Sequence, residues 1–148
     1  MPHVVVKATA VGSAGDLSRI TEKLEGLDVN ILAIGGGEGV VGQTETGVLS
    51  ILIDPEDSGT VGSVVDELTG LGLANVEVAS NIQIELPNEI GELRKAADAV
   101  QGFNIRSIVM MAFGVNTAHV GLGFDPGEVE QAERALQDAG IAVIPHAE

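Results

Sequence analysis

The feature that most constrains the fold of this chain is an order of apolar patterns that occurs twice. In each pass, a β-rich run is followed by apolar residues at helical spacing, two further strand-like runs, a second helical pattern and a short final strand. The two passes meet near Ser80. Self-similarity of this kind indicates a repeated structural unit. We therefore predict two domains, at residues 1–80 and 81–148.

The expected elements follow from the apolar spacing and from the Gly, Pro and Asp residues at element ends. In the first half they are strands at residues 3–11, 29–34, 48–53 and 76–79 and helices at residues 17–27 and 61–71. In the second half they are strands at residues 82–86, 104–113, 118–124 and 141–144 and helices at residues 93–100 and 129–139. The glycine-rich stretch at residues 35–47 is interpreted as a hairpin connection.

Two helices of the second half carry clear apolar stripes, which we expect to face the core. The stripe residues are Leu93, Ala96, Ala97 and Val100 in the first of these helices and Val129, Ala132, Ala135, Leu136 and Ala139 in the second.

The order strand, helix, strand, strand, helix, strand folds as a four-stranded antiparallel sheet with both helices on one face. We therefore predict an α+β protein made of two tandem ferredoxin-like βαββαβ domains. Strands of the first half are apolar at nearly every position, as in residues 4–6 and 48–53. We expect the sheet face away from the helices to be covered as well, by the other half or by a second copy of the chain.

Composition excludes several classes of function. The chain has 22 Asp and Glu residues against seven Lys and Arg, a formal net charge of -15, which repels nucleic acid and anionic membranes. It has no Cys, which rules out disulfides and thiolate chemistry. No apolar run reaches the roughly 18 residues of a membrane span. We expect a cytoplasmic protein that binds neither nucleic acid nor membrane.

Catalytic and cofactor motifs are poorly represented. Residues 37–42 fit the pattern G-x-G-x-x-G, but they lead into another predicted strand, whereas a dinucleotide-binding loop opens a helix. His3, His119 and His146 are scattered, without carboxylates at the spacing of metal ligands. We therefore expect no catalytic residue, no metal and no cofactor, in a protein that is not an enzyme.

Strand-to-helix turns in both halves carry a family resemblance. The turns are residues 13–17 and 88–93, and residues 27–31 and 102–105 follow the first helix of each half. With this order of elements, the chain resembles the ACT domain family, regulatory modules that bind amino acids at the loop after the first strand and at interfaces between domains. The resemblance covers nearly the whole chain, twice.

The resemblance implies ligand-binding residues in both halves. They are Ala14, Gly15, Asp16, Leu17, Asn30 and Ile31 in the first half and Asn88, Glu89, Ile90, Gly91, Glu92, Leu93, Asn104 and Ile105 in the second. Glycine in each turn lets the backbone approach a ligand, and free amides at the helix start can hold a carboxylate. Asn88 makes the second loop the stronger candidate, because Gly12 stands at the corresponding place in the first. Alternatively, these loops only turn a strand into a helix, with Asn88 as a turn or cap residue.

The resemblance implies a regulatory protein that binds an amino acid and signals through the packing of its domains or subunits. We also expect a homodimer or higher homo-oligomer, because an apolar sheet face needs a cover, and a possible partner enzyme that receives the signal. The alternative hypothesis is a ligand-free protein-interaction module, or a regulatory subunit of a metabolic enzyme.

Overall fold

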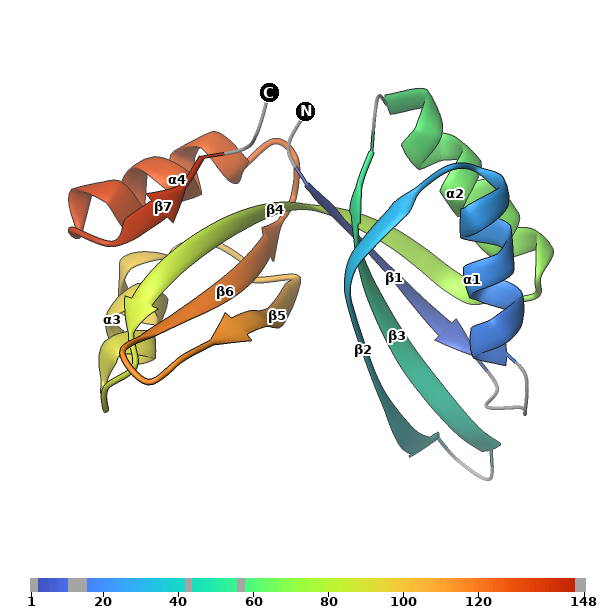
Figure 1. The fold of residues 1–148 in the computed structure, drawn as a ribbon, viewed down its shortest axis with the longest axis horizontal. Coiled ribbons are helices and arrows are strands. Elements are labelled where there is room, and N and C mark those ends of the chain that lie inside the picture. Colours follow the sequence, from blue (N-terminus) through green and yellow to red (C-terminus); the bar gives the residue numbers. More distant parts are fainter. Residues whose placement is uncertain (1–2, 11–15, 42–43, 56–57, 146–148) are drawn as a thin grey trace. The chain divides into compact units, whose positions relative to one another are not determined.

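A computed structural model describes residues 3–10, 16–41, 44–55 and 58–145. The chain divides into two compact units, His3–Val78 and Ala79–Glu148. The first unit contains β1 (Val4–Ala10), α1 (Asp16–Gly26), β2 (Asn30–Val41), β3 (Thr44–Asp54) and α2 (Ser58–Gly70). The second contains α3 (Glu92–Ala99), β5 (Ser107–Phe113), β6 (Thr117–Phe124), α4 (Val129–Asp138) and β7 (Ala142–Ile144). Strand β4 (Ala74–Pro87) begins in the first unit and ends in the second (Figure 1).

Both units have the same strand order. In the first unit the order is β2-β3-β1-β4, and β3 pairs antiparallel with β1 and with β2. In the second it is β7-β4-β6-β5, with every pairing antiparallel. If the strands of each unit are numbered one to four along the chain, both orders read 4-1-3-2. Strand β4 is the fourth strand of the first unit and the first strand of the second. The antiparallel pairing and the helices confirm the predicted α+β class.

The core of the first unit is aliphatic and lies on one face of the sheet. Alternate residues of β1 and β3 point into it because successive strand side chains face opposite ways. Helices α1 and α2 cover this face (Figure 1). The buried residues that they and the strands contribute are Val4, Val6, Ala8, Ile20, Leu24, Ile51, Ile53, Val64 and Leu68.

The core of the second unit is built the same way, with α3 and α4 over one face of the sheet. Its buried members are Ile82, Ile84, Leu86, Ala96, Val100, Val120, Leu122, Phe124, Ala132 and Leu136. The expected burial of Leu93, Ala97 and Ala139 was wrong, because these side chains are exposed and Leu93 is 48% accessible. Ala96 and Val100 are four residues apart and face the core together. Leu93 and Ala97 are also four residues apart, but they lie on a neighbouring side of α3 that solvent reaches.

The glycine-rich stretch differs from its prediction. Residues 35–41 belong to β2, whose register with β3 runs from Gly35↔Ser50 to Val41↔Thr44. Glycine has a low strand propensity, which made these residues resemble a loop. Residues 35–41 nevertheless form a strand, because the backbone hydrogen bonds between β2 and β3 need no side chain. Residues 42–43, also part of the expected connection, lie outside the described residues.

The strands expected at residues 76–79 and 82–86 are one continuous strand. Ser80 and Asn81 between them are polar, which suggested a break in the sequence pattern. Both are paired within the ladder, Ser80 with Phe124 and Asn81 with Gly123. Strand β4 therefore serves both units.

Three helices end in the same hydrogen-bonded motif. After α1, the amide of Val29 donates to Leu24 O and the amide of Asp28 donates to Glu25 O, which is the Schellman pattern. The same two bonds follow α2 and α4, where Gly72 and Gly140 occupy the left-handed position with φ of 90° and 80°. At the end of α1 that position is Asp28, with φ of 57°. The first helix thus places a carboxylate where the other two have no side chain.

This difference predicts opposite effects of substitution at equivalent positions. Asp28→Gly should raise the free energy of unfolding by about 0.5–1 kcal/mol, because an L-residue in the left-handed region is strained. Gly140→Ala should lower it by about 1 kcal/mol for the same reason. Urea unfolding followed by far-UV circular dichroism measures both, since the chain has no Trp or Tyr for fluorescence. A loss of stability in Asp28→Gly would contradict the strain.

The sheet of the second unit leaves no room for a side chain at two positions of β6. A Cβ added to Gly121 would lie 2.7 Å from the Oδ1 of buried Asn81, and Gly123 is tighter still. A Cβ added to Gly123 would overlap the Ser107 hydroxyl oxygen and lie 3.2 Å from the Cβ of Ala79. Gly123 pairs with both Asn81 on β4 and Ser107 on β5. The missing side chain is what gives the Ser107 hydroxyl room to lie over β6.

Filling this space should be costly and partly reversible. Gly123→Ala should lower the free energy of unfolding by about 1–3 kcal/mol, as overpacking usually does. The double variant Gly123→Ala with Ser107→Gly should recover part of that loss, which a double-mutant cycle in urea measures. Gly127→Ala is the matched control, because a Cβ there meets nothing within 4 Å. Independent, additive effects of the two substitutions would contradict the clash.

Candidate functional site

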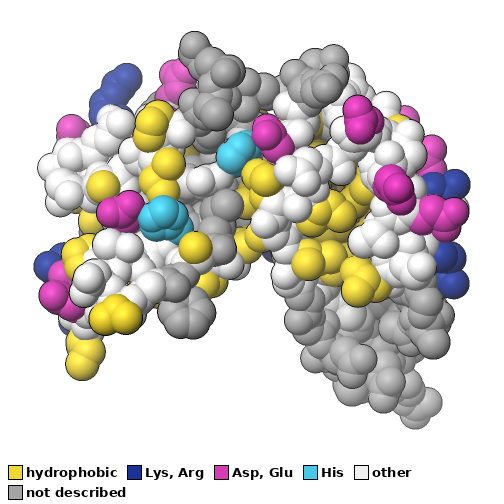
Figure 2. All heavy atoms as spheres, in the orientation of Figure 1, with side chains coloured by type: hydrophobic (Ala, Val, Ile, Leu, Met, Phe, Trp, Pro, Cys, Tyr) yellow, Lys and Arg dark blue, Asp and Glu magenta, His cyan; other side chains and the backbone are white. Residues whose placement is uncertain are grey.

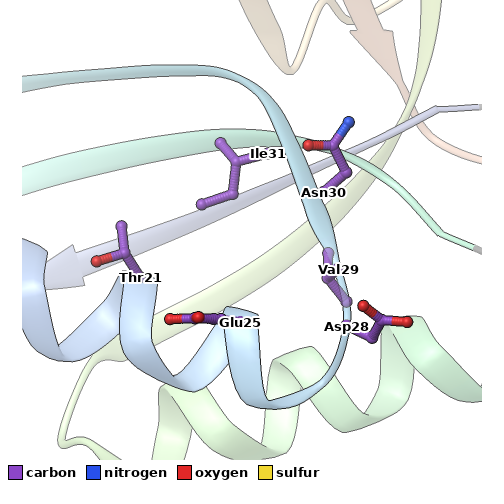
Figure 3. Close-up of a pocket in the computed structure, with 6 residues that line it drawn as sticks. All are labelled: Thr21, Glu25, Asp28, Val29, Asn30 and Ile31. Carbon is purple, nitrogen blue, oxygen red and sulfur yellow. The ribbon is translucent and has the colours of Figure 1, made fainter.

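A pocket of about 400 Å³ lies beside the junction of α1 and β2 (Figure 3). We call it the α1–β2 pocket. It is lined by Thr21, Glu25, Asp28, Val29, Asn30 and Ile31. Its volume falls within the range of small-molecule sites in proteins.

Helix and strand geometry bring these residues together. Thr21 and Glu25 are four residues apart, so they share one face of α1. Ile31 pairs with Ile53 in the sheet and packs against the core of the first unit. In Figure 3 its side chain extends from β2 toward the side on which Thr21 and Glu25 lie. The pocket therefore has an apolar wall on the strand and polar groups on the helix.

Acidic groups dominate the electrostatics of the α1–β2 pocket. Glu25 and Asp28 contribute two carboxylates, and none of the six lining residues is cationic. The single proton of the Thr21 hydroxyl is shared between the carbonyl oxygens of Leu17 at 2.9 Å and Ser18 at 3.1 Å, and the hydroxyl oxygen can still accept a hydrogen bond. The pocket is suited to a positively charged group such as an ammonium.

Asp28 holds its place in this pocket at a cost in backbone energy. Its positive φ of 57° is uncommon outside glycine, although Asp and Asn tolerate it better than other residues do. The glycines at the equivalent ends of α2 and α4 show that the helix ending itself does not need a carboxylate. Strained residues of this kind are often found at functional sites.

The second loop uses Asn88 to hold a turn. Its side-chain Nδ2 donates to Gly114 O at 2.8 Å, and its backbone amide donates to Asn116 O at 2.8 Å. These bonds tie the loop after β4 to the turn between β5 and β6. One side-chain N–H of Asn88 is therefore engaged within the protein, in keeping with the turn role that the sequence left open.

The rest of this loop leads into α3. Gly91 precedes the helix with φ of 89°, a left-handed conformation that favours glycine. Ile90 beside it is fully exposed. Glu92 accepts a 2.8 Å hydrogen bond from Lys95, and this bond and the charge of Glu92 raise the pKa of the Lys95 amine.

The structure brings together two of the residues implied by the resemblance, Asn30 and Ile31, in the α1–β2 pocket. Ala14 and Gly15 lie outside the described residues, and Asp16 begins α1 with its side chain not described. Leu17 is exposed on α1. Asn104 is exposed, and Ile105 packs against the core of the second unit. Neither is among the described residues that line the α1–β2 pocket. A ligand-binding role for all of these residues stays a prediction.

Sequence reasoning missed the acidic part of the pocket. Thr21 and Glu25 carry no sequence motif, and Asp28 was noted only as part of residues 27–31, which carry the family resemblance. One signal in the sequence could have pointed to Asp28. The helices α2 and α4 are each followed by a glycine, Gly72 and Gly140, at the position where α1 is followed by Asp28. Within the described ranges, no three His, Asp or Glu side chains are grouped as metal ligands. No helix in the described part of the chain is long and apolar enough to span a membrane.

The chain matches no protein-family model and no curated protein sequence. Among solved structures it is similar to protein BT0572 from Bacteroides thetaiotaomicron, with 19% identity and a TM-score of 0.66 over 97% of this chain and 92% of that one. The ligand-free regulatory subunit of aspartate kinase from Thermus thermophilus has 14% identity and a TM-score of 0.61 over 93% and 92% of the two chains. Aspartate kinase from Clostridium acetobutylicum has 18% identity and a TM-score of 0.62 over 93% of this chain and 32% of that enzyme.

At these levels of identity, the likeness establishes the fold. The chain has the fold of the regulatory subunit of aspartate kinase, and the resemblance to ACT-domain regulatory proteins predicted from the sequence is confirmed at the level of the fold.

Proposed function

We propose that this protein is a regulatory protein that binds an amino acid, with the α1–β2 pocket as its ligand site. The proposal includes two tandem ferredoxin-like, ACT-like domains, at residues 1–80 and 81–148, and a binding rather than a catalytic role. Its fold is that of a protein named as a regulatory subunit, which supports a regulatory role. The identical strand order of the two units supports the duplication.

The observation that carries the proposal is Asp28 in the α1–β2 pocket. Asp28, whose backbone is in the left-handed region, lines the pocket with Glu25 and with Asn30, which the resemblance implies as a ligand contact. Either carboxylate can accept a hydrogen bond from the ammonium of an amino acid. The Asn30 amide can donate to the ligand carboxylate and also accept from its ammonium. Ile31 and Val29 supply the apolar wall against which a ligand side chain can pack.

The location of the pocket suggests how binding becomes a signal. The pocket lies where the end of α1 meets the first residues of β2, and β2 is an edge strand of its unit. A ligand that holds α1 against β2 favours one packing of this edge over others. A binding event shifts an equilibrium only through such differential affinity. We infer that the packing of this edge is read by a second copy of the chain, in a homodimer or higher homo-oligomer, or by a partner enzyme.

Thermal unfolding in the presence of each of the twenty amino acids tests the proposal. A selective ligand raises the unfolding temperature because it binds only the native state, with about 2.7 kcal/mol gained at 100 times its dissociation constant. For the amino acid that binds, Glu25→Gln and Asp28→Asn should each weaken binding about tenfold, since each removes a charge opposite the ammonium.

Two control variants separate this site from the other candidates. Asn30→Ala should weaken binding, whereas Asn104→Ala, the matching position of the second unit, should leave it unchanged. Glu130→Gln on α4 controls for a general change in net charge. No response to any amino acid by the folded protein, at low and high salt, would contradict an amino-acid site. A response that only Asn88→Ala abolishes would move the site to the second loop.

A second candidate function is favoured by a separate observation. Ile90 and Val115 are almost fully exposed, on two loops that Asn88 ties together through Gly114 and Asn116. Exposed apolar side chains that lie close together are typical of surfaces that contact another protein. This feature supports a protein-interaction module that regulates an enzyme without a ligand of its own.

A further inference from the structure

Carboxylates greatly outnumber cationic side chains in this chain. The sequence has 22 Asp and Glu residues and seven Lys and Arg residues. Even if every Lys and Arg neutralised one carboxylate, 15 carboxylates would remain among 148 residues, about one in ten. Figure 2 shows Asp and Glu side chains on the surface of both units. Repulsion among these charges opposes the compact state.

Ion pairs among the described residues offset little of this repulsion. The pairs that involve Lys or Arg join Lys23 to Glu67, Arg94 to Asp98, Lys95 to Glu92 and Arg106 to Asp125. The four cationic side chains are at least 44% exposed, so each pair contributes little to stability. The excess of negative charge is therefore carried by a surface on which local pairing is weak.

Three helices place a carboxylate where the helix itself disfavours negative charge. The last turns of α2, α3 and α4 contain Glu67, Asp98 and Asp138, and none of these turns contains a basic residue. Free carbonyl groups give the C-terminus of a helix a partial negative charge, which repels a carboxylate in the last turn. Helix α2 also has no acidic residue in its first turn, where one would be stabilising. Dissolved salt screens this repulsion.

From this arrangement we infer that the fold is an ionic-strength-sensitive switch, in which dissolved salt controls how much of the chain is folded. At low ionic strength the excess carboxylates repel one another, and the helix ends repel Glu67, Asp98 and Asp138. At about 1 M salt the Debye length is about 3 Å, compared with about 10 Å at 0.1 M, so both repulsions are screened. Burial of the aliphatic cores does not depend on this screening. The inference does not rest on a ligand in the α1–β2 pocket.

Helix α4 provides two carboxylates that test the part played by the helix ends. Glu130 lies in the first turn of α4, and Asp138 is its last residue. Both are exposed, and each is four residues from Arg134, on opposite sides of it along the helix. Removing either charge changes the net charge of the chain by the same amount. The helix dipole favours the charge of Glu130 and disfavours that of Asp138.

Thermal unfolding of the 148-residue chain in KCl, from about 0.02 M to about 2 M, tests the inference by far-UV circular dichroism. We expect the unfolding temperature to rise by about 10 °C or more over this range. Tetramethylammonium chloride should act like KCl at equal ionic strength, because screening does not depend on which cation is present. Sucrose is the uncharged control, since it is excluded from protein surfaces without screening charges.

Two variants of α4 isolate the effect of the helix ends from that of net charge. At the lowest salt, Asp138→Asn should unfold about 1–4 °C above Glu130→Gln, because only Asp138 is repelled by its helix end. The difference should close at the highest KCl concentration and should persist in sucrose. Asp138→Glu keeps the charge and should behave as the unmodified chain does. Spectra recorded at high salt verify that each variant is folded.

Three outcomes would overturn the inference. The first is an unfolding temperature that stays constant or falls as KCl is added. The second is the same unfolding temperature for Asp138→Asn and Glu130→Gln at every salt concentration, which would mean that the helix ends take no part. The third is a rise with KCl and none with tetramethylammonium chloride, which would replace screening by specific cation binding. None of these results decides whether the α1–β2 pocket binds an amino acid, so the two proposals fail separately.

Discussion

Burial of one aliphatic sheet face beneath two helices is the interaction on which the other features of each unit depend. In the first unit, Ile20 and Leu24 anchor α1 over the strands, and Val64 and Leu68 anchor α2 beside it. The core contains no aromatic side chain, so its stability comes from many close aliphatic contacts. Once α1 is fixed by its buried stripe, its two remaining flanks face β2 on one side and α2 on the other. The two hollows lined by described residues, the α1–β2 pocket and a groove between α1 and α2, therefore lie along this one helix.

The two flanks of α1 differ in charge because of where its polar residues fall around the helix. Thr21 and Glu25 lie one turn apart and face β2, whereas Arg19 and Lys23 lie one turn apart and face α2. An acidic pocket and a charge-balanced groove thus arise from a single eleven-residue helix.

The second unit is built in the same order but uses its equivalent parts differently. Asn88, the expected ligand contact, ties its loop to the turn at Gly114, and Ile90 next to it points into solvent. In the first unit, Asn30 lines a pocket with two carboxylates. The described Asn residues of the two units therefore have different surroundings: Asn88 holds a turn, whereas Asn30 lines a pocket.

The sequence by itself determined the α+β class and the order of the elements, because apolar periods of two and 3.6 residues report directly on strands and helices. The family resemblance added Asn30 and Ile31 as ligand contacts, which stay a prediction. It misjudged residues 35–41, where backbone pairing with β3 outweighs the poor strand propensity of glycine, and the break at Ser80, which the ladder with β6 removes. Only the tertiary structure decided the site chemistry. Thr21, Glu25 and Asp28 meet Asn30 because α1 ends and turns back onto the sheet, a proximity that no local pattern encodes.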